Sequence, residues 1–120
     1  MESQSAVSAL SALAHPGRLE VFRLLVRAGP DGMTAGDIAR ATDSLANTLS
    51  TNLNVLAGAG LARSRREGRS IIYAATYDRM RELLAFLMED CCGGNTEICG
   101  PLAAIAERAA CCAVETSNER

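Results

Sequence analysis

The chain has 120 residues, of which 48% are hydrophobic and 3% aromatic, so its size corresponds to one compact domain. Its apolar residues are mainly Ala and Leu, and it has no Trp. This composition favours a mostly helical core over a broad β-sandwich. A formal net charge of −2 argues against a protein that coats nucleic acid indiscriminately, although it allows a local basic patch.

The sequence shows neither a membrane span nor a secretory signal. No apolar run reaches the roughly 18–20 residues that a span needs, and residues 1–14 lack a basic stretch followed by an apolar one. We therefore expect a cytoplasmic protein without a membrane partner. Four of the five cysteines form adjacent pairs, which are poor material for a disulfide framework. In a reducing cytosol they are thiols available to a soft ligand.

Two helices are predicted at the start of the chain. In residues 3–14, apolar side chains recur with the spacing of an amphipathic helix, at Val7, Leu10, Leu13 and Ala14. Pro16 suits the first position of a second helix at 17–28, and His15 before it is expected to mark the boundary without any other function. The second helix is apolar enough to be central to the core through Leu19, Val21, Phe22, Leu24, Leu25 and Val26.

The residues after the Gly-Pro-Asp-Gly turn at 29–32 predict two more helices. Thr34 and Asp37 form a variant capping box, which predicts a short helix at 35–41 with Ile38 facing inward. After a polar turn, the next helix covers 45–59. It has one stripe that we expect to be buried, formed by Leu45, Leu49, Leu53 and Leu56. Gly60 is expected to end this helix in the left-handed conformation.

The only strong β signal follows, with strands at 61–66 and 70–75 separated by Glu67-Gly68-Arg69. Residues 77–90 return to helical spacing, with Met80, Leu83, Leu84 and Leu87 aligned. A glycine-rich loop, a last helix from Pro101 to about Cys112 and a polar tail complete the chain. We therefore expect a domain at 1–90, a cysteine-containing extension at 91–112 and a flexible tail at 113–120.

The helices at 35–41 and 45–59 and the arginine-rich hairpin are the parts of a winged helix-turn-helix, a mainly α fold with a small β-hairpin wing. One side of the second helix is uncharged and has hydroxyl and amide groups that suit base edges in a major groove: Asn47, Thr48, Ser50, Thr51 and Asn54. Alone, this side could equally be a solvated surface. The hairpin favours DNA, because Arg65, Arg66 and Arg69 suit phosphate or minor-groove contacts.

These elements resemble the arsenic-responsive repressors of the ArsR/SmtB family over about residues 10–90. The resemblance is carried by the order and spacing of Leu13-Ala14-His15-Pro16-Gly17-Arg18-Leu19, Asp37-Ile38-Ala39, Leu49-Ser50-Thr51-Asn52-Leu53-Asn54-Val55-Leu56 running into Ala59-Gly60-Leu61, and Arg66-Glu67-Gly68-Arg69 closing at Tyr73. It implies a repressor that binds double-stranded operator DNA as a homodimer through its first and fifth helices, here 3–14 and 77–90. The sequence departs from the family at Asn52, where His is frequent, and at Asn54, where a basic residue is frequent.

The cysteines after the fifth helix predict an inducer site. Cys91 and Cys92 follow that helix, and Cys99 returns after a loop whose glycines let the chain fold back. As(III) and Sb(III) favour three thiolates, whereas tetrahedral zinc usually takes four ligands at closer spacing. The resemblance implies the same location, since some arsenic-responsive members use a vicinal pair and a third cysteine there. Cys111 and Cys112 are either accessory metal ligands or incidental.

The sequence therefore predicts a repressor that leaves its operator when As(III) or Sb(III) binds these thiolates. Two alternatives keep the same fold: a redox or persulfide switch, and a sensor that uses a cysteine pair to select methylarsenite. The free cysteines could also pack as small hydrophobic side chains, although two adjacent ones cannot both face a core. A thiol enzyme is disfavoured, because the chain has one histidine and no C-x-x-C on a βαβ unit.

Overall fold

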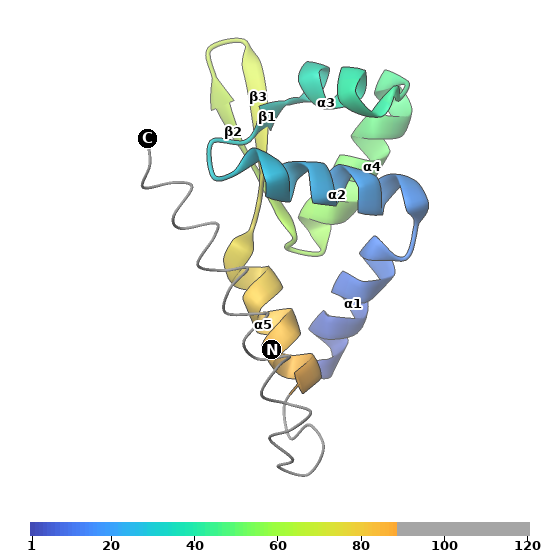
Figure 1. The fold of residues 1–120 in the computed structure, drawn as a ribbon, viewed down its shortest axis with the longest axis vertical. Helices are drawn as coiled ribbons and strands as arrows, with labels where there is room; N and C mark the ends of the chain where they lie inside the picture. The colour runs from blue at the N-terminus through green and yellow to red at the C-terminus, as the bar shows by residue number, and fades with distance from the viewer. Residues whose placement is uncertain (89–120) are drawn as a thin grey trace.

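The computed structural model describes residues 1–88, which form five helices and a three-stranded sheet (Figure 1). The wing tip and the third helix lie at one end of the molecule, and the first and fifth helices lie at the other. The mainly helical winged fold is therefore confirmed. The five cysteines, the last predicted helix and the tail lie outside the described residues. None of the described helices has the length and apolar character needed to cross a membrane.

Helix α1 (Ser3–Leu13) turns a different side to the core than we predicted. Its buried residues are Ala6, Ala9 and Ala12, whereas Val7 is 61% and Leu10 42% exposed. The three alanines recur every third residue on one face of the helix. Their small side chains let the backbone of α1 come close to its neighbours. The helix is confirmed, but Val7 and Leu10 face outward, while Leu13 is half-buried and packs against the core.

Helix α2 (Pro16–Ala28) is tied to α1 at a joint between His15 and Arg18. The backbone N–H groups of Gly17 and Arg18 donate to His15 Nδ1, over 3.2 and 3.4 Å. Arg18 Nε donates back to the Ala12 carbonyl at the end of α1, over 2.7 Å. The helix-boundary interpretation of His15 is therefore confirmed.

The core face of α2 consists of Val21, Phe22 and Leu25. Leu19, which we expected in the core, is 42% exposed. Two of the buried residues are adjacent and the third comes three positions after Phe22, so the core takes one side of the helix, as the helical period requires. A segment with so many apolar residues cannot bury all of them against one core, and Leu19 falls outside the buried side.

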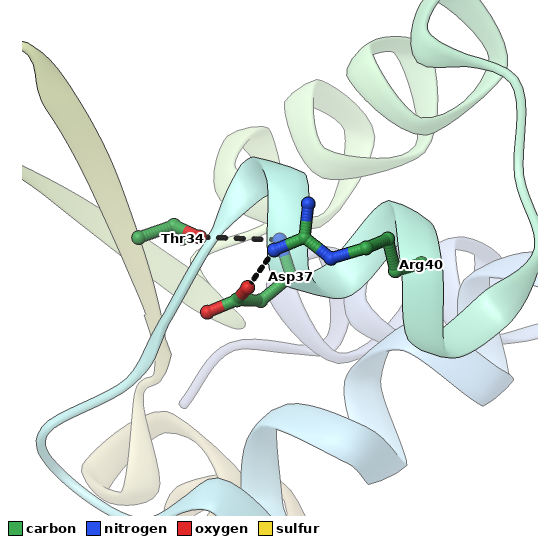
Figure 2. A network of polar contacts seen from close by, with 3 residues as sticks. All are labelled: Thr34, Asp37 and Arg40. Carbon is green, nitrogen blue, oxygen red and sulfur yellow. Dashed lines mark hydrogen bonds and ion pairs between the residues drawn. The ribbon is translucent and has the colours of Figure 1, made fainter.

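Helix α3 (Ala35–Thr42) begins at the predicted cap (Figure 2). Thr34 Oγ1 accepts a hydrogen bond from the Asp37 N–H over 3.1 Å, and the Asp37 carboxylate forms an ion pair with Arg40 one turn later. Ile38 is fully buried, as predicted. The strand β1 (Met33–Thr34) was not predicted. Two residues are too few to show the alternation by which a strand is recognised.

Helix α4 (Ala46–Gly58) buries three of its four predicted leucines, Leu49, Leu53 and Leu56. The prediction for Leu45 was wrong, because this residue is the N-cap of α4 and its side chain is 74% exposed. The capping residue has extended backbone angles (φ −69°, ψ 147°), so its side chain leaves the direction of the helical stripe. The stripe therefore starts one turn later.

The end of α4 is the predicted left-handed glycine. Gly60 has φ +79°, its N–H donates to the Ala57 carbonyl over 3.0 Å, and the Leu61 N–H donates to the Leu56 carbonyl over 2.9 Å. These two bonds form a Schellman motif, and the buried pair Leu56 and Leu61 supplies its apolar contact. This motif sets the direction in which the chain enters the wing.

The wing is antiparallel, with strand order β1-β3-β2. Strands β2 (Ala62–Glu67) and β3 (Ser70–Ala75) are joined by a two-residue turn, one residue shorter than predicted, because Glu67 pairs with Ser70. Gly68 takes the first turn position with φ +61°. Helix α5 (Tyr77–Met88) follows and buries Leu83. The last two residues of its predicted range lie outside the described part of the chain.

Candidate nucleic-acid interface

The five predicted base-contacting side chains all lie on the exposed side of α4. Asn47, Thr48, Ser50, Thr51 and Asn54 are exposed. The opposite side, formed by Leu49, Asn52, Leu53 and Leu56, is buried. The exposed side carries no charge, and its hydroxyl and amide groups can both donate and accept hydrogen bonds. Groups of this kind can read the donor and acceptor pattern of base edges.

Two of these side chains also stabilise the first turns of α4. Asn47 Oδ1 accepts a hydrogen bond from the Thr48 N–H over 2.9 Å, which satisfies one of the free donors at the helix start. Thr51 Oγ1 donates to the Asn47 carbonyl over 3.0 Å. The Asn47 amide nitrogen and the acceptor lone pairs of Thr51 are left for an incoming base edge. The geometry leaves both residues able to bind while they order the helix.

The three predicted wing arginines differ in their surroundings. Arg65 Nε donates to Glu67 Oε2 over 2.7 Å, and Arg65 Nη2 donates to the Asp31 carbonyl over 2.9 Å. Arg65 therefore links the wing to the turn before β1. Arg66 and Arg69 are exposed at the tip, and neither side chain has an ion pair or hydrogen bond with another residue in the described part of the chain. Their guanidinium groups are free for a phosphate.

At this end of the molecule, the positive charge lies on the wing, and the uncharged hydrogen-bonding groups lie on α4. Four arginines lie between positions 63 and 69, opposed by Glu67 alone, while the exposed side of α4 is neutral. Phosphate attraction is not sequence-specific, whereas base-edge contacts are. The wing can supply the electrostatic attraction, and α4 can supply the discrimination between base pairs.

Leu45 is a residue of this surface that sequence reasoning missed. It stands immediately before the uncharged residues of α4 and is exposed with them. A signal was present, because Leu45 follows the polar turn directly, and a residue at a helix start does not follow the helical period.

Tyr77 joins the wing to α5. Its hydroxyl donates to the Val26 carbonyl at the end of α2 over 3.2 Å. Burial raises the pKa of Tyr77 above 10.0, and the nearby positive charge of Arg63 on β2 opposes this rise. Tyr77, the first residue of α5, therefore bonds to α2 and lies within the electrostatic reach of Arg63 on the wing.

The predicted inducer site remains a prediction. Its ligands Cys91, Cys92 and Cys99, and the accessory pair Cys111 and Cys112, lie outside the described residues. Within residues 1–88, no three His, Cys, Asp or Glu side chains are grouped so that they could hold a metal ion.

Comparison with known proteins agrees with this arrangement. Residues 13–65 match the helix-turn-helix domain family. The chain is similar to the solved structure of NolR from Sinorhizobium fredii, with 30% identity, coverage of 72% of this chain and 84% of that one, and a TM-score of 0.59. An ArsR-like transcriptional regulator from Rhodococcus sp. RHA1 is 26% identical, with 88% and 93% coverage and a TM-score of 0.64.

A third similar structure is the homodimeric winged helix-turn-helix DNA-binding domain of a Mycobacterium bovis protein. It is 29% identical, the match covers 71% of this chain and 77% of that one, and the TM-score is 0.59.

Proposed function

Since the chain belongs to the ArsR family of winged helix-turn-helix DNA-binding transcriptional regulators and not to an enzyme family, we propose that it is a homodimeric repressor that metalloids release from DNA. The inducer is As(III) or Sb(III), and its ligands are the thiolates of Cys91, Cys92 and Cys99. In the apo dimer, two α4 helices bind successive major grooves of a two-fold symmetric operator.

The observation that carries the DNA-binding part is the neutral exposed side of α4 beside an arginine-rich wing. Asn47, Thr48, Ser50, Thr51 and Asn54 contact base edges, and Arg66 and Arg69 contact phosphates. Arg65 supports the wing through its bonds to Glu67 and the Asp31 carbonyl. This division of roles suits a protein whose net charge is negative overall.

The homodimer is supported by apolar surface at the end opposite the wing. Val7 and Leu10 on α1 are 61% and 42% exposed, and Leu87 on α5 is 52% exposed. The helices α1 and α5 contact each other there (Figure 1). Large exposed apolar side chains on adjacent helices are typical of an oligomer interface. The similar DNA-binding domain from Mycobacterium bovis is homodimeric.

The inducer part is supported by the donor set and by its position in the chain. Cys91 and Cys92 come three and four residues after Met88, the last described residue of α5. Three thiolates without a neighbouring histidine suit the soft, three-coordinate As(III) ion. A ligand that closes this site acts on α5, which Tyr77 joins to the wing and to α2. A coupling of about 1–3 kcal/mol would change operator affinity by about 5–150-fold.

An arsenite titration of the protein–operator complex, followed by gel shift, tests the proposal. We expect arsenite to release the wild-type protein, while Cys91→Ser, Cys92→Ser and Cys99→Ser bind operator normally and stay bound in arsenite. Release of all three variants at wild-type arsenite concentrations contradicts the assigned ligands. The double variant Cys111→Ser/Cys112→Ser decides whether the second pair is accessory, in which case its arsenite response weakens, or incidental.

Intact-mass spectrometry separates metalloid sensing from a thiol redox switch. We expect the mass of bound arsenic to be retained by wild-type protein and lost in the Cys91→Ser variant. If a disulfide or polysulfide bridge forms after oxidant treatment and releases the DNA while arsenite does not, the redox alternative replaces the metalloid proposal.

A further inference from the structure

Leu45 occupies a position that is unfavourable for leucine in two independent ways. Its side chain is 74% exposed, the highest exposed fraction among the large apolar side chains of residues 1–88. It is also the N-cap of α4 and makes no capping hydrogen bond. Ser, Thr, Asp or Asn at this place would satisfy an N–H at the helix start and would be better solvated. A residue that neither caps the helix nor buries its apolar side chain is a candidate for a functional role.

Hydrogen bonds hold the backbone on both sides of Leu45. Its carbonyl accepts the first hydrogen bond of α4, from the Leu49 N–H over 2.9 Å. The preceding turn is held by the Ser44 N–H, which donates to the Ala39 carbonyl over 3.0 Å, and by a 2.7 Å bond between the Thr42 and Ser44 hydroxyls. The leucine is therefore presented by a fixed backbone at the beginning of the helix.

The helix start is the part of a recognition helix that reaches base edges. The exposed residues that follow Leu45 are Ala46, Asn47 and Thr48, so the leucine is continuous with the proposed DNA-binding side and adds an apolar group to it. The major groove displays one apolar group, the C5-methyl of thymine. An apolar side chain gains from this contact because both surfaces leave water.

We propose that Leu45 is a specificity-determining residue that contacts a thymine methyl in each operator half-site. The inference rests on the proposed DNA-binding function and extends it from hydrogen-bonding side chains to an apolar one. It assigns to Leu45 the recognition of thymine over bases that lack the methyl.

Deoxyuridine substitution tests this contact, because deoxyuridine differs from thymidine only by the missing C5-methyl. Binding sites are first selected from a random DNA duplex library with the full-length protein. Each thymine of the selected half-site is then replaced by deoxyuridine in turn. We expect one replacement to weaken wild-type binding about fourfold per half-site, the factor associated with burying one such group. Leu45→Ala should bind more weakly than wild type and should not respond to that replacement.

The matched control is Val55→Ala, which truncates another exposed apolar side chain of α4. Val55 lies in the groove between α4 and α1, away from the helix start. This variant should keep both the affinity and the deoxyuridine response of wild type.

A second variant separates recognition from helix stability. Leu45→Ser introduces a good capping residue, so we expect its Tm to rise by about 4 °C, while its affinity for the selected sites falls. A lower Tm in Leu45→Ser would show that leucine stabilises the turn and would overturn the proposal. It is likewise overturned if no deoxyuridine replacement distinguishes wild type from Leu45→Ala. Failure of the wild type to select any sequence would instead overturn the DNA-binding function.

Discussion

At the scale of single residues, a few polar side chains hold the elements in their relative positions. Arg18 and His15 fix the joint between α1 and α2, Arg65 fixes the wing to the turn before β1, and Tyr77 fixes α5 to α2. Each of these bonds reaches a backbone group. A single hydrogen bond of this kind contributes about 1 kcal/mol, so no one of them determines the fold. Together they add to the apolar core in holding the elements against one another.

Tyr77→Phe should destabilise the protein by about 1 kcal/mol near neutral pH, because the bond to the Val26 carbonyl is lost. The raised pKa of Tyr77 also makes wild-type stability depend on alkaline pH. A folded pKa above the unfolded value of about 10 gives stability that is complete below pH 10 and is lost as pH rises through the folded pKa. Urea unfolding at a series of pH values should show this loss in wild type and a weaker loss in Tyr77→Phe.

Tyr73→Phe provides a direct check, since it leaves Tyr77 as the single tyrosine of the chain. An ultraviolet absorbance titration of this variant should give a midpoint above 10.0, in line with the raised pKa of Tyr77. A midpoint at or below the ordinary tyrosine value would contradict the assigned burial.

Arg66→Ala and Arg65→Ala should affect DNA binding differently. Loss of a phosphate contact at Arg66 should lower the slope of log K against log salt by about one unit for each protomer and leave Tm unchanged. Arg65→Ala breaks two bonds within the protein, so we expect Tm to fall. Fluorescence anisotropy over a salt series measures the slope. A wild-type slope in Arg66→Ala would remove Arg66 from the interface.

Among the secondary-structure elements, local signals start and end the helices, and residues with positive φ, Asp43 and several glycines, occupy turns between elements. The cap at Thr34 and the left-handed conformation of Gly60 were both predicted, because each depends on residues within one or two turns of chain. The short strand β1 was not predicted. It exists because Met33 and Thr34 pair with Tyr73 and Ile72 on β3, far away in the sequence.

Gly32→Ala should destabilise the protein far more than Gly68→Ala. Both glycines have positive φ, +75° and +61°, so the backbone cost of about 1–2 kcal/mol is matched between them. A Cβ at Gly32 would collide with the backbone carbonyl of Tyr73, whereas one at Gly68 meets no atom within 4 Å. We expect roughly 1–3 kcal/mol of additional destabilisation for Gly32→Ala in chemical unfolding. Equal losses would show that β1 is not held against β3.

At the scale of the whole molecule, the two ends have different chemistry. The wing is rich in arginine and the start of α4 is uncharged and polar except for Leu45, whereas α1 and α5 expose Val7, Leu10 and Leu87. The alanine face of α1 explains why α1 exposes apolar side chains. Because Ala6, Ala9 and Ala12 form the buried face, Val7 and Leu10 are left at the surface.

Leu10→Arg should convert the proposed dimer to monomer and abolish operator binding, because the charge would be buried in the interface. Leu19→Arg is the matched control, since Leu10 and Leu19 are both 42% exposed and Leu19 lies on α2. We expect Leu19→Arg to remain dimeric. Analytical ultracentrifugation measures the mass of both variants, and a dimeric Leu10→Arg protein would contradict the proposed interface.

Local sequence patterns predicted the order of the helices, the hairpin, the cap at Thr34, the left-handed Gly60 and the polar side of α4. These features follow from neighbouring residues, so a local pattern contains the information. The sequence also predicted the cysteine site, whose residues lie outside the described part of the chain.

Long-range packing decides which side of α1 is buried, that β1 joins the wing, and that Arg65 bonds to a carbonyl 34 positions away. Each of these depends on contacts between distant parts of the chain. Local propensity does not specify those contacts, because packing of the surrounding elements selects among side-chain faces that have similar local energies.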